Sequence, residues 1–178
     1  MRRYTAVRSY DHDAEYVGLL QRVVETMRLG ARLAASTFDF GAALPGPVDV
    51  VFVGALIHWV YCRTASFEAR MDLVADYLFQ YVARYLVIEW VDPADLSVRG
   101  FATRDGFPAR CRENISDPTR GYTLASFQHN LRRHGEIIEA FDHRRGEWIK
   151  ADALEADRPA PTRSKSGTRV IYVVRKRP

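Results

Sequence analysis

The chain has 178 residues, of which 47% are hydrophobic and 27% charged, and its formal net charge is +4. This length suits one domain with its own core, and the composition is that of an ordinary soluble globular protein. No apolar run is long enough to cross a bilayer, and no apolar segment follows Arg2 and Arg3 as a secretion signal requires. We therefore expect a single domain over residues 1–178, located in the cytoplasm and without a membrane partner.

Two features of the composition limit the chemistry. Cys62 and Cys111 are too few and too irregularly spaced to indicate a disulfide framework or a zinc site. The C-terminal stretch TRSKSGTRVIYVVRKRP carries six basic groups and no acidic one. It is a candidate contact for nucleic acid or an anionic surface, although most short basic ends are solvated.

The first predicted elements are a strand and a helix. Tyr4 to Arg8 alternates weakly, as a short strand does, and leads to the cluster Asp11, His12, Asp13. From Ala14 to Leu29 the apolar residues fall on one helical face, with Asp13 as N-cap and Gly30 as the end; they are Val17, Leu20, Val24 and Met27. Adjacent residues at a helix start point in different directions and capping explains Asp13, so we expect no metal site in this cluster.

A second strand is predicted from Arg32 to Thr37, running into Phe38, Asp39 and Phe40. A turn-rich link then leads to the stretch Val48 to Cys62, VDVVFVGALIHWVYC. Its short apolar start is typical of a strand that is covered on both faces inside a parallel sheet.

The residues that follow this apolar strand are the first candidates for a site. Ligands of open α/β sheets bind outside the carboxyl ends of the strands. This places Gly54, Ala55, His58 and Trp59 at the expected edge of a site.

A strand–helix–strand unit is predicted through Val91. The next helical face has Ser66 as its N-cap and consists of Phe67, Met71, Val74, Ala75, Leu78 and Val82. Tyr85 to Val91, YLVIEWV, is a second buried-strand pattern. A βαβ crossover of this kind indicates parallel strands that are neighbours or near neighbours.

The rest of the chain begins with an insertion at about residues 92–122, rich in glycine, proline and arginine. A helix follows that Thr123 caps and Gly135 ends, and then come predicted strands at Ile137 to Phe141 and Thr168 to Arg175. We expect these two strands to form an antiparallel hairpin at a sheet edge.

The order of these elements resembles that of a class I S-adenosylmethionine-dependent methyltransferase. The elements that carry the resemblance are a helix that ends in LG, a strand that leads into FDF, the strands VDVVFVGALIHWV and YLVIEWV, a helix that begins with YTLASF, and the strand RVIYVVRK. The resemblance extends from about Tyr4 to Lys176 and covers the later two-thirds of that fold. It implies a Rossmann-like, mostly parallel α/β sheet with an antiparallel C-terminal strand, and S-adenosylmethionine as cofactor.

The resemblance also implies roles for individual residues. Asp11 would accept hydrogen bonds from the cofactor ribose, and Asp39 would bind the adenine amine beside the ring of Phe38 or Phe40. Val53, Gly54 and Ala55 would line the methionine end of the cofactor. His58 and Trp59 would border the pocket of the methyl acceptor, which the sequence does not identify.

The chain departs from this family at the first strand, whose Gly-x-Gly turn lets the backbone approach the cofactor. No Gly-x-Gly occurs in the sequence, and the missing strand would lie between those predicted at Tyr4 to Arg8 and Val48 to Val53. Three explanations are open: a fragment, a first strand supplied by a second chain, or a degenerate sheet. We favour a truncated or split methyltransferase that by itself binds S-adenosylmethionine weakly or not at all.

Two site residues have a structural alternative. His58 is the candidate catalytic base, since histidine accepts a proton near neutral pH, and the alternative that we favour is a structural role. Glu89 lies near the end of a buried strand, where an unpaired charge is costly. It therefore either faces the substrate or pairs with an arginine.

Three functional hypotheses follow. The first is methyl transfer to an O or N atom of an acceptor, once the missing part is present. The second is a non-catalytic methyltransferase-like subunit or remnant that acts by binding a partner. The third and weakest is nucleic-acid binding through the basic tail and the arginines of the insertion, which are Arg99, Arg104, Arg110, Arg112 and Arg120.

Overall fold

The computed structural model describes residues 6–11, 13–30, 33–37, 39–92, 114, 116–143, 146–150 and 169–178. The chain divides into two compact units, residues 1–43 and residues 44–178. A single domain over the whole chain stays a prediction. The insertion predicted at about residues 92–122 lies largely outside the described residues.

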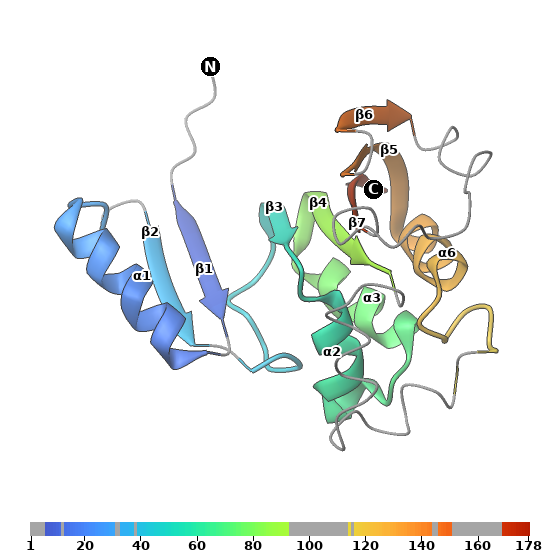
Figure 1. Cartoon of the computed structure of the whole chain (residues 1–178), viewed down its shortest axis with the longest axis horizontal. Helices are drawn as coiled ribbons and strands as arrows, with labels where there is room; N and C mark the ends of the chain where they lie inside the picture. Colours follow the sequence, from blue (N-terminus) through green and yellow to red (C-terminus); the bar gives the residue numbers. More distant parts are fainter. Residues whose placement is uncertain are drawn as a thin grey trace. The chain divides into compact units, whose positions relative to one another are not determined.

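The first unit is a strand–helix–strand segment. It contains β1 (Val7–Asp11), α1 (Ala14–Thr26) and β2 (Leu33–Thr37) (Figure 1). Its two strands pair in parallel from Val7 opposite Leu33 to Asp11 opposite Thr37. The helix begins where the sequence predicted, because Oδ1 of Asp13 accepts the amide hydrogen of Glu15 at 2.8 Å.

Two boundaries in this unit differ from the prediction. The first strand covers Val7–Asp11 instead of Tyr4 to Arg8. The helix ends at Thr26, because Arg28 adopts a left-handed φ of 54° and stops the helix before Gly30. Met27 is consequently exposed and not part of the buried face.

The second unit is built on a five-stranded sheet. Its elements in chain order are β3 (Val48–Val53), α2 (Ile57–Arg63), the 3₁₀ turn η1 (Ala65–Phe67), α3 (Met71–Gln80), β4 (Val82–Val91), α6 (Leu124–His134), β5 (Gly135–Asp142), β6 (Glu147–Lys150) and β7 (Arg169–Lys176). The strand order is β3-β4-β7-β5-β6.

The strand directions confirm the predicted fold class. The pair β3 and β4 is parallel, as the βαβ pattern predicted, whereas β7 runs antiparallel to both β4 and β5. Three strands of this sheet, β3, β4 and β5, therefore point the same way. The chain is a mixed α/β protein with an antiparallel C-terminal strand.

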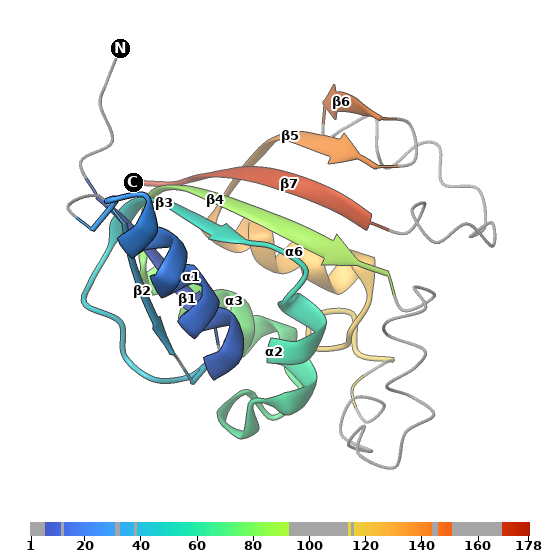
Figure 2. The same cartoon turned by 60° about the vertical axis from the view of Figure 1, so that its left-hand side comes forward.

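The core of this unit lies between the sheet and three helices. Figure 2 shows α2, α3 and α6 beneath the sheet, all on one of its faces. On that face Trp90 of β4 is fully buried, with its ring 4.7 Å from that of Tyr122 and 4.9 Å from that of Phe127. The hydroxyl of Tyr122 donates to the Val91 carbonyl at 2.7 Å, so the aromatic packing also satisfies a polar group.

The prediction that Val48 to Val53 is covered on both faces is wrong for the described residues. Strand β3 is an edge strand, and Val48, Val50 and Phe52 are 42%, 40% and 67% exposed. The three side chains alternate along the strand and so share one face. The alternate residues of the strand are Asp49, Val51 and Val53, and of these Val53 is buried.

Three further differences concern element bounds and strand order. The helix expected from Ser66 begins at Met71, because Glu68 and Ala69 both adopt a left-handed φ of 51° and separate it from η1. His58 and Trp59 lie on a helix, α2, whereas the sequence analysis included them in the strand VDVVFVGALIHWV. The last strand, β7, lies inside the sheet between β4 and β5, and the edge is formed by β6, which the sequence did not predict.

The helix α6 agrees with the sequence at both ends. Thr123 caps its start by accepting the Ser126 amide hydrogen at 3.1 Å, and Gly135 follows its last residue. A Cβ at Gly135 would lie 2.5 Å from the Arg175 carbonyl oxygen. Glycine therefore allows the close approach of β5 to β7.

Candidate functional site

Acidic residues gather at the carboxyl end of the sheet in the first unit. Asp11 is the last residue of β1 and lies opposite Thr37, the last residue of β2; Asp39 follows two residues later. The Asp11 carboxylate accepts the Asp13 amide hydrogen at 2.9 Å. Asp39 is exposed and Phe40 half-buried, while Phe38 lies outside the described residues.

The carboxyl end of β3 in the second unit leads into a tight backbone turn. Val53 is buried, and after Gly54 the backbone of Ala55 takes a left-handed φ of 48°. This turn directs the Ala55 amide at Glu89 of β4, whose Oε2 accepts its hydrogen at 2.6 Å. A Cβ at Gly54 would lie 2.8 Å from the Phe52 ring, so a larger residue there requires that ring to move.

Glu89 is the best-connected charged group at this end of the sheet. Its Oε1 lies 3.5 Å from Nη1 of Arg169 and 3.9 Å from Nε2 of His143, and the residue is 9% exposed. We call Ala55, Glu89, His143 and Arg169 the Glu89 cluster. Of the two alternatives for Glu89, the structure contains the arginine pair, and a substrate contact stays a prediction.

The Glu89 cluster combines an acceptor with fixed donors. Removing a carboxylate from water is costly unless charged and hydrogen-bonded groups replace the water. The Ala55 amide and the Arg169 guanidinium do so here. The cluster therefore fixes the turn after β3 against β4, at the place where the cofactor contacts of Gly54 and Ala55 are predicted.

His58 and Trp59 lie on α2, directly after this turn. His58 is 3% exposed, and its ring centroid lies 6.0 Å from that of the half-buried Trp59. The Arg63 guanidinium lies over the Trp59 ring at 5.5 Å, within the range of a cation–π contact. The role of His58 as a base stays a prediction, and so does that of Trp59 in the acceptor pocket.

The sequence analysis missed Arg169 and His143 as partners of Glu89. In the antiparallel pair of β4 and β7, Glu89 lies opposite Ile171 and Val91 opposite Arg169. Arg169 is a basic residue at the start of an apolar strand, but its pairing with Glu89 can be predicted only when the register of β7 on β4 is known. His143 follows β5, and no pattern in the sequence relates it to Glu89.

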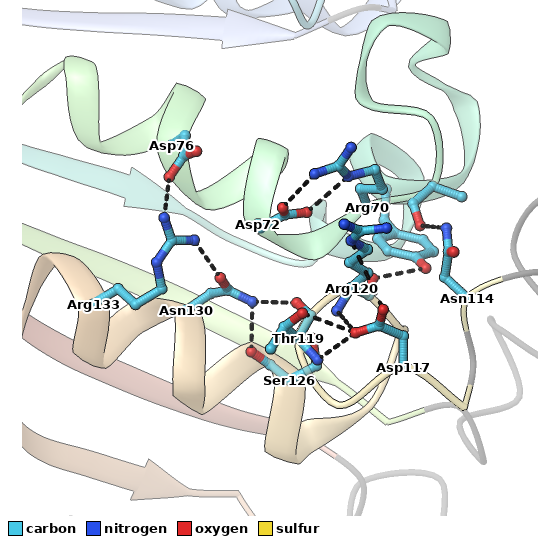
Figure 3. Close-up of polar contacts among 12 residues, drawn as sticks. Arg70, Asp72, Asp76, Asn114, Asp117, Thr119, Arg120, Ser126, Asn130 and Arg133 are labelled. Carbon is cyan, nitrogen blue, oxygen red and sulfur yellow. Dashed lines mark hydrogen bonds and ion pairs between the residues drawn. The ribbon is translucent and has the colours of Figure 1, made fainter.

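A polar network joins the segment before α6 to the start of α3 (Figure 3). Two hydrogen bonds join Arg70 to Asp72, with Nη2 2.7 Å from Oδ2 and Nε 3.2 Å from Oδ1. The Arg120 carbonyl accepts the Met71 amide hydrogen at 2.9 Å and the Tyr61 hydroxyl at 3.2 Å. The network thus fixes this segment against α2 and α3.

The network accounts for Arg120, one of the arginines predicted to bind an anion. Its side chain lies 3.8 Å from Oδ2 of Asp117, and its amide donates to Asp117 Oδ1 at 3.0 Å. Hydrogen bonds from the Thr119 amide and hydroxyl, with that of Arg120, keep the pKa of Asp117 below its usual value. The remaining arginines of the prediction, Arg99, Arg104, Arg110 and Arg112, lie outside the described residues.

The described residues contain no group of three or more His, Cys, Asp or Glu side chains that could hold a metal ion. None of their helices is long and apolar enough to cross a bilayer. An apolar cavity lined by Ile57, Val74 and Phe127 measures only about 10 Å³, less than a ligand needs.

No protein-family model and no curated protein matches the sequence. Solved structures do match the fold. The magnesium protoporphyrin IX methyltransferase ChlM from Synechocystis PCC 6803, with bound SAH, has a TM-score of 0.51 at 17% identity over 97% of this chain and 64% of its own. The N-methyltransferase NodS from Bradyrhizobium japonicum WM9 has a TM-score of 0.54 at 10% identity over 96% of this chain and 73% of its own. The [4+2]-cyclase SpnF also has a TM-score of 0.54, at 16% identity over 96% of this chain and 66% of its own.

The chain therefore has the fold of class I S-adenosylmethionine-dependent methyltransferases, as its sequence predicted. It spans about two-thirds of the length of these neighbours. At such low identities the likeness defines the fold, and it leaves the reaction open because SpnF is a cyclase.

Proposed function

We propose that the chain is part of an S-adenosylmethionine-dependent methyltransferase that transfers a methyl group to an O or N atom of its acceptor. One observation carries the proposal: the strands of a methyltransferase fold end in the groups that such a cofactor requires. Asp11 is the last residue of β1, Asp39 follows β2, and the Gly54–Ala55 turn follows β3. The cytoplasm is its expected compartment.

Each group has a chemical task in this proposal. A ribose offers two hydroxyl donors, which a carboxylate such as that of Asp11 accepts. Asp39 accepts a hydrogen bond from the exocyclic amine of the adenine, and the side chain of Phe38 or Phe40 packs on the adenine ring. Val53, Gly54 and Ala55 hold the methionine end, where the Ala55 amide is fixed by Glu89.

The acceptor side requires positioning more than acid–base chemistry. The sulfonium already carries a good leaving group, so a correctly oriented nucleophile reacts without strong activation. Trp59 and Glu89 border the acceptor in this proposal, and His58 removes a proton if the acceptor is a hydroxyl or a protonated nitrogen.

A non-catalytic methyltransferase-like subunit is the second candidate. This candidate is favoured by the position of β3 at an edge of the sheet in the described part of the chain, because the unpaired side of an edge strand can bind another chain. Methyl transfer and partner binding are separable, since only the first requires Asp39 and Asp11.

Photo-crosslinking of radiolabelled S-adenosylmethionine tests the enzyme proposal. The chain would be irradiated together with a strand–turn–helix polypeptide that supplies a Gly-x-Gly turn, and the labelled peptides mapped. We expect label at Asp39–Phe40 and at Gly54–Ala55, and at least a tenfold loss of label in Asp39→Ala, since tenfold corresponds to about 1.4 kcal/mol, or roughly one hydrogen bond to a charged group.

The matched control is Asp49→Ala, which removes an exposed carboxylate at the start of β3. It should leave the labelling unchanged. Label spread over the surface, or equal loss in Asp49→Ala and Asp39→Ala, would remove the enzyme proposal and leave the subunit.

A further inference from the structure

Basic side chains gather at the end of the five-stranded sheet where β3 and β4 begin, away from the Gly54–Ala55 turn and Glu89. Because β7 runs antiparallel to β4, its last residues and the C-terminus lie at this end (Figure 2). The last turn of α6 lies here as well, since β5 starts directly after it. We call the basic residues of this end the basic surface; they are Arg84, Arg132, Arg133, Arg175, Lys176 and Arg177.

Backbone pairing brings the end of β7 to the end of α6. Gly135, the first residue of β5, lies opposite Lys176, the last residue of β7. One position further on, the Arg177 amide donates to the His134 carbonyl at 3.1 Å. Arg177 therefore continues the strand pairing, and it lies beside the helical turn that supplies the two arginines of α6.

The basic residues at the end of β7 alternate between the two faces of the sheet. Lys176 points toward the helices, where its Nζ donates to the carbonyl of Phe79, in α3, at 2.9 Å. Arg175 and Arg177 consequently share the other face, about 6.7 Å apart along an extended backbone. Arg175 and Arg177 are both exposed.

Strand β4 adds an aromatic ring and a further guanidinium group to this face. Tyr85 lies opposite Arg175, and directly opposed residues of paired strands share a face. The Arg84 guanidinium lies over the Tyr85 ring, 5.5 Å from its centroid, within the range of a cation–π contact. Arg84 is exposed and Tyr85 half-buried.

Acidic groups only partly balance this charge. In the described part of the chain, three acids lie at this end of the sheet, namely Asp49, Asp76 and Glu136. Asp76 is shared, since its Oδ1 lies 3.6 Å from Nη2 of Arg133 and 2.8 Å from Nε2 of His134. Glu136 pairs with Arg175. No ion pair joins Arg84 or Arg177 to another described residue.

The composition of the basic surface fits a chain of phosphates. Five of its six residues are arginines, and a guanidinium group donates two parallel hydrogen bonds to a phosphate. The separation of Arg175 and Arg177 is close to that of successive phosphates in a nucleic-acid strand. Arginine planes and aromatic rings also stack on bases. An anionic membrane matches the charge of this surface, but neither the spacing of its arginines nor the ring of Tyr85.

We propose that the basic surface binds the phosphate backbone of a nucleic acid without reading its sequence. Contacts to phosphates supply the affinity of sequence-independent binding, because they release the counterions of the nucleic acid. The proposal goes beyond methyl transfer and does not rest on it, since no residue of the basic surface belongs to the candidate cofactor or acceptor site.

The test measures how a fluorescent single-stranded oligonucleotide of mixed sequence binds to the full chain at several salt concentrations. Fluorescence anisotropy gives the association constant. Its logarithm should fall linearly with the logarithm of the salt concentration, by about 0.7 for each phosphate that is contacted. We expect a slope of about −2 or steeper, which corresponds to roughly three or more phosphates.

A double variant, Arg84→Gln with Arg177→Gln, removes the two exposed guanidinium groups that have no ion pair with a described residue. It should weaken binding by about tenfold or more and make the salt slope shallower by about 1.4, the contribution of two phosphates. The matched control is Arg22→Gln with Lys150→Gln, which removes two exposed cations on α1 and β6. It should bind as the unchanged chain does, and circular dichroism checks that both double variants fold.

Absence of oligonucleotide binding at low salt would overturn the proposal, as would a binding constant that does not change with salt. Equal losses in the two double variants would also overturn it, because net charge alone would then explain the binding. Binding to phosphatidylserine vesicles without binding to the oligonucleotide would assign the surface to a membrane instead. The result is independent of the enzyme proposal, since the oligonucleotide is titrated without S-adenosylmethionine.

Discussion

Glu89 is the residue on which the geometry of the candidate site depends most. It joins three parts of the second unit: the turn after β3, through the Ala55 amide; the start of β7, through Arg169; and the end of β5, through His143. Because Ala55 takes a left-handed φ without being glycine, its turn is held by tertiary contacts rather than by local preference.

Replacing Glu89 by alanine should therefore lower the stability of the chain. The change leaves the Ala55 amide without its acceptor and Arg169 without its carboxylate, and a lost buried hydrogen bond of this kind costs about 1–3 kcal/mol. Urea denaturation followed by circular dichroism measures the free energy of unfolding. Glu139→Ala, at an exposed position of β5, is the control and should change it by less than about 0.5 kcal/mol. Equal effects of the two variants would contradict the role of Glu89.

His58 can be assigned by comparing stability with activity. A buried histidine in a structural role should lower the free energy of unfolding by about 1–3 kcal/mol when it is replaced by alanine. If His58 is instead a base, His58→Ala should lose activity in the presence of the strand–turn–helix polypeptide while its stability stays unchanged, and the pH profile of the rate should flatten near neutrality. We expect the loss of stability, because His58 is 3% exposed. His58→Ala with unchanged stability would contradict this expectation.

At the scale of elements, the start of α3 is held by a charge pair. Burial of the Asp72 carboxyl acts to raise its pKa, but the hydrogen bonds and the charge of Arg70, with the amide hydrogens at the helix start, outweigh burial and leave the pKa of Asp72 below its usual value. The hydrogen bonds that Arg70 donates to Asp72 likewise raise the pKa of Arg70. The pair therefore stabilises the fold only while Asp72 is ionised.

This linkage predicts how the contribution of Asp72 depends on pH. A carboxyl whose pKa is lowered by folding adds stability above its unfolded pKa, about 3.9, and loses it as the pH falls through the folded value. Asp72→Asn should consequently be less stable than the unchanged chain at pH 7, and the difference should shrink below about pH 4. Urea denaturation at several pH values measures it, with Asp49→Asn as a control for the loss of one exposed negative charge. A difference that grows as the pH falls would contradict the assignment.

The helix α1 has two apolar sides. Val17 and Val24 are buried, whereas a second row remains exposed at spacings of three and four residues; it consists of Tyr16, Leu19, Val23 and Met27. Such spacing places the four side chains on one helical face. A surface helix of an isolated unit normally has one apolar side.

Two substitutions in α1 separate its apolar sides. Val24→Ala should destabilise the chain by about 1–3 kcal/mol, since it removes buried methyl groups and leaves a cavity. Leu19→Ser, on the exposed side, should change the free energy of unfolding by less than about 0.5 kcal/mol. Thermal and urea denaturation give both values. If Leu19→Ser were as costly as Val24→Ala, the second side would already be covered in the chain.

For the molecule as a whole, the elements that were predictable are those whose signals are local. Asp13 predicted the start of α1 and Gly135 the end of α6, because a cap interacts with backbone groups only a few residues away. The parallel pair of β3 and β4 followed from two apolar runs joined by a helix. The false helix start at Ser66 has a different cause, since Glu68 and Ala69 adopt left-handed angles that their residue types do not suggest.

The order of the strands in the sheet and the contacts between them could not be predicted, because they depend on the register between segments that are distant in the sequence. The place of β7 between β4 and β5 pairs residues about 80 positions apart, as in the contact of Glu89 with Arg169. No periodicity in a single strand carries that information. For the same reason, the position of β3 at an edge of the sheet, with Phe52 exposed, could not be predicted from its apolar residues.

Isothermal titration calorimetry of S-adenosylmethionine into the 178-residue chain measures whether the chain holds the cofactor unaided. We infer that this fold needs a further strand beyond β3 before it holds the cofactor. We predict no binding in the micromolar range by the chain alone, and binding once the strand–turn–helix polypeptide with its Gly-x-Gly turn is present. Micromolar binding by the chain alone would contradict the claim.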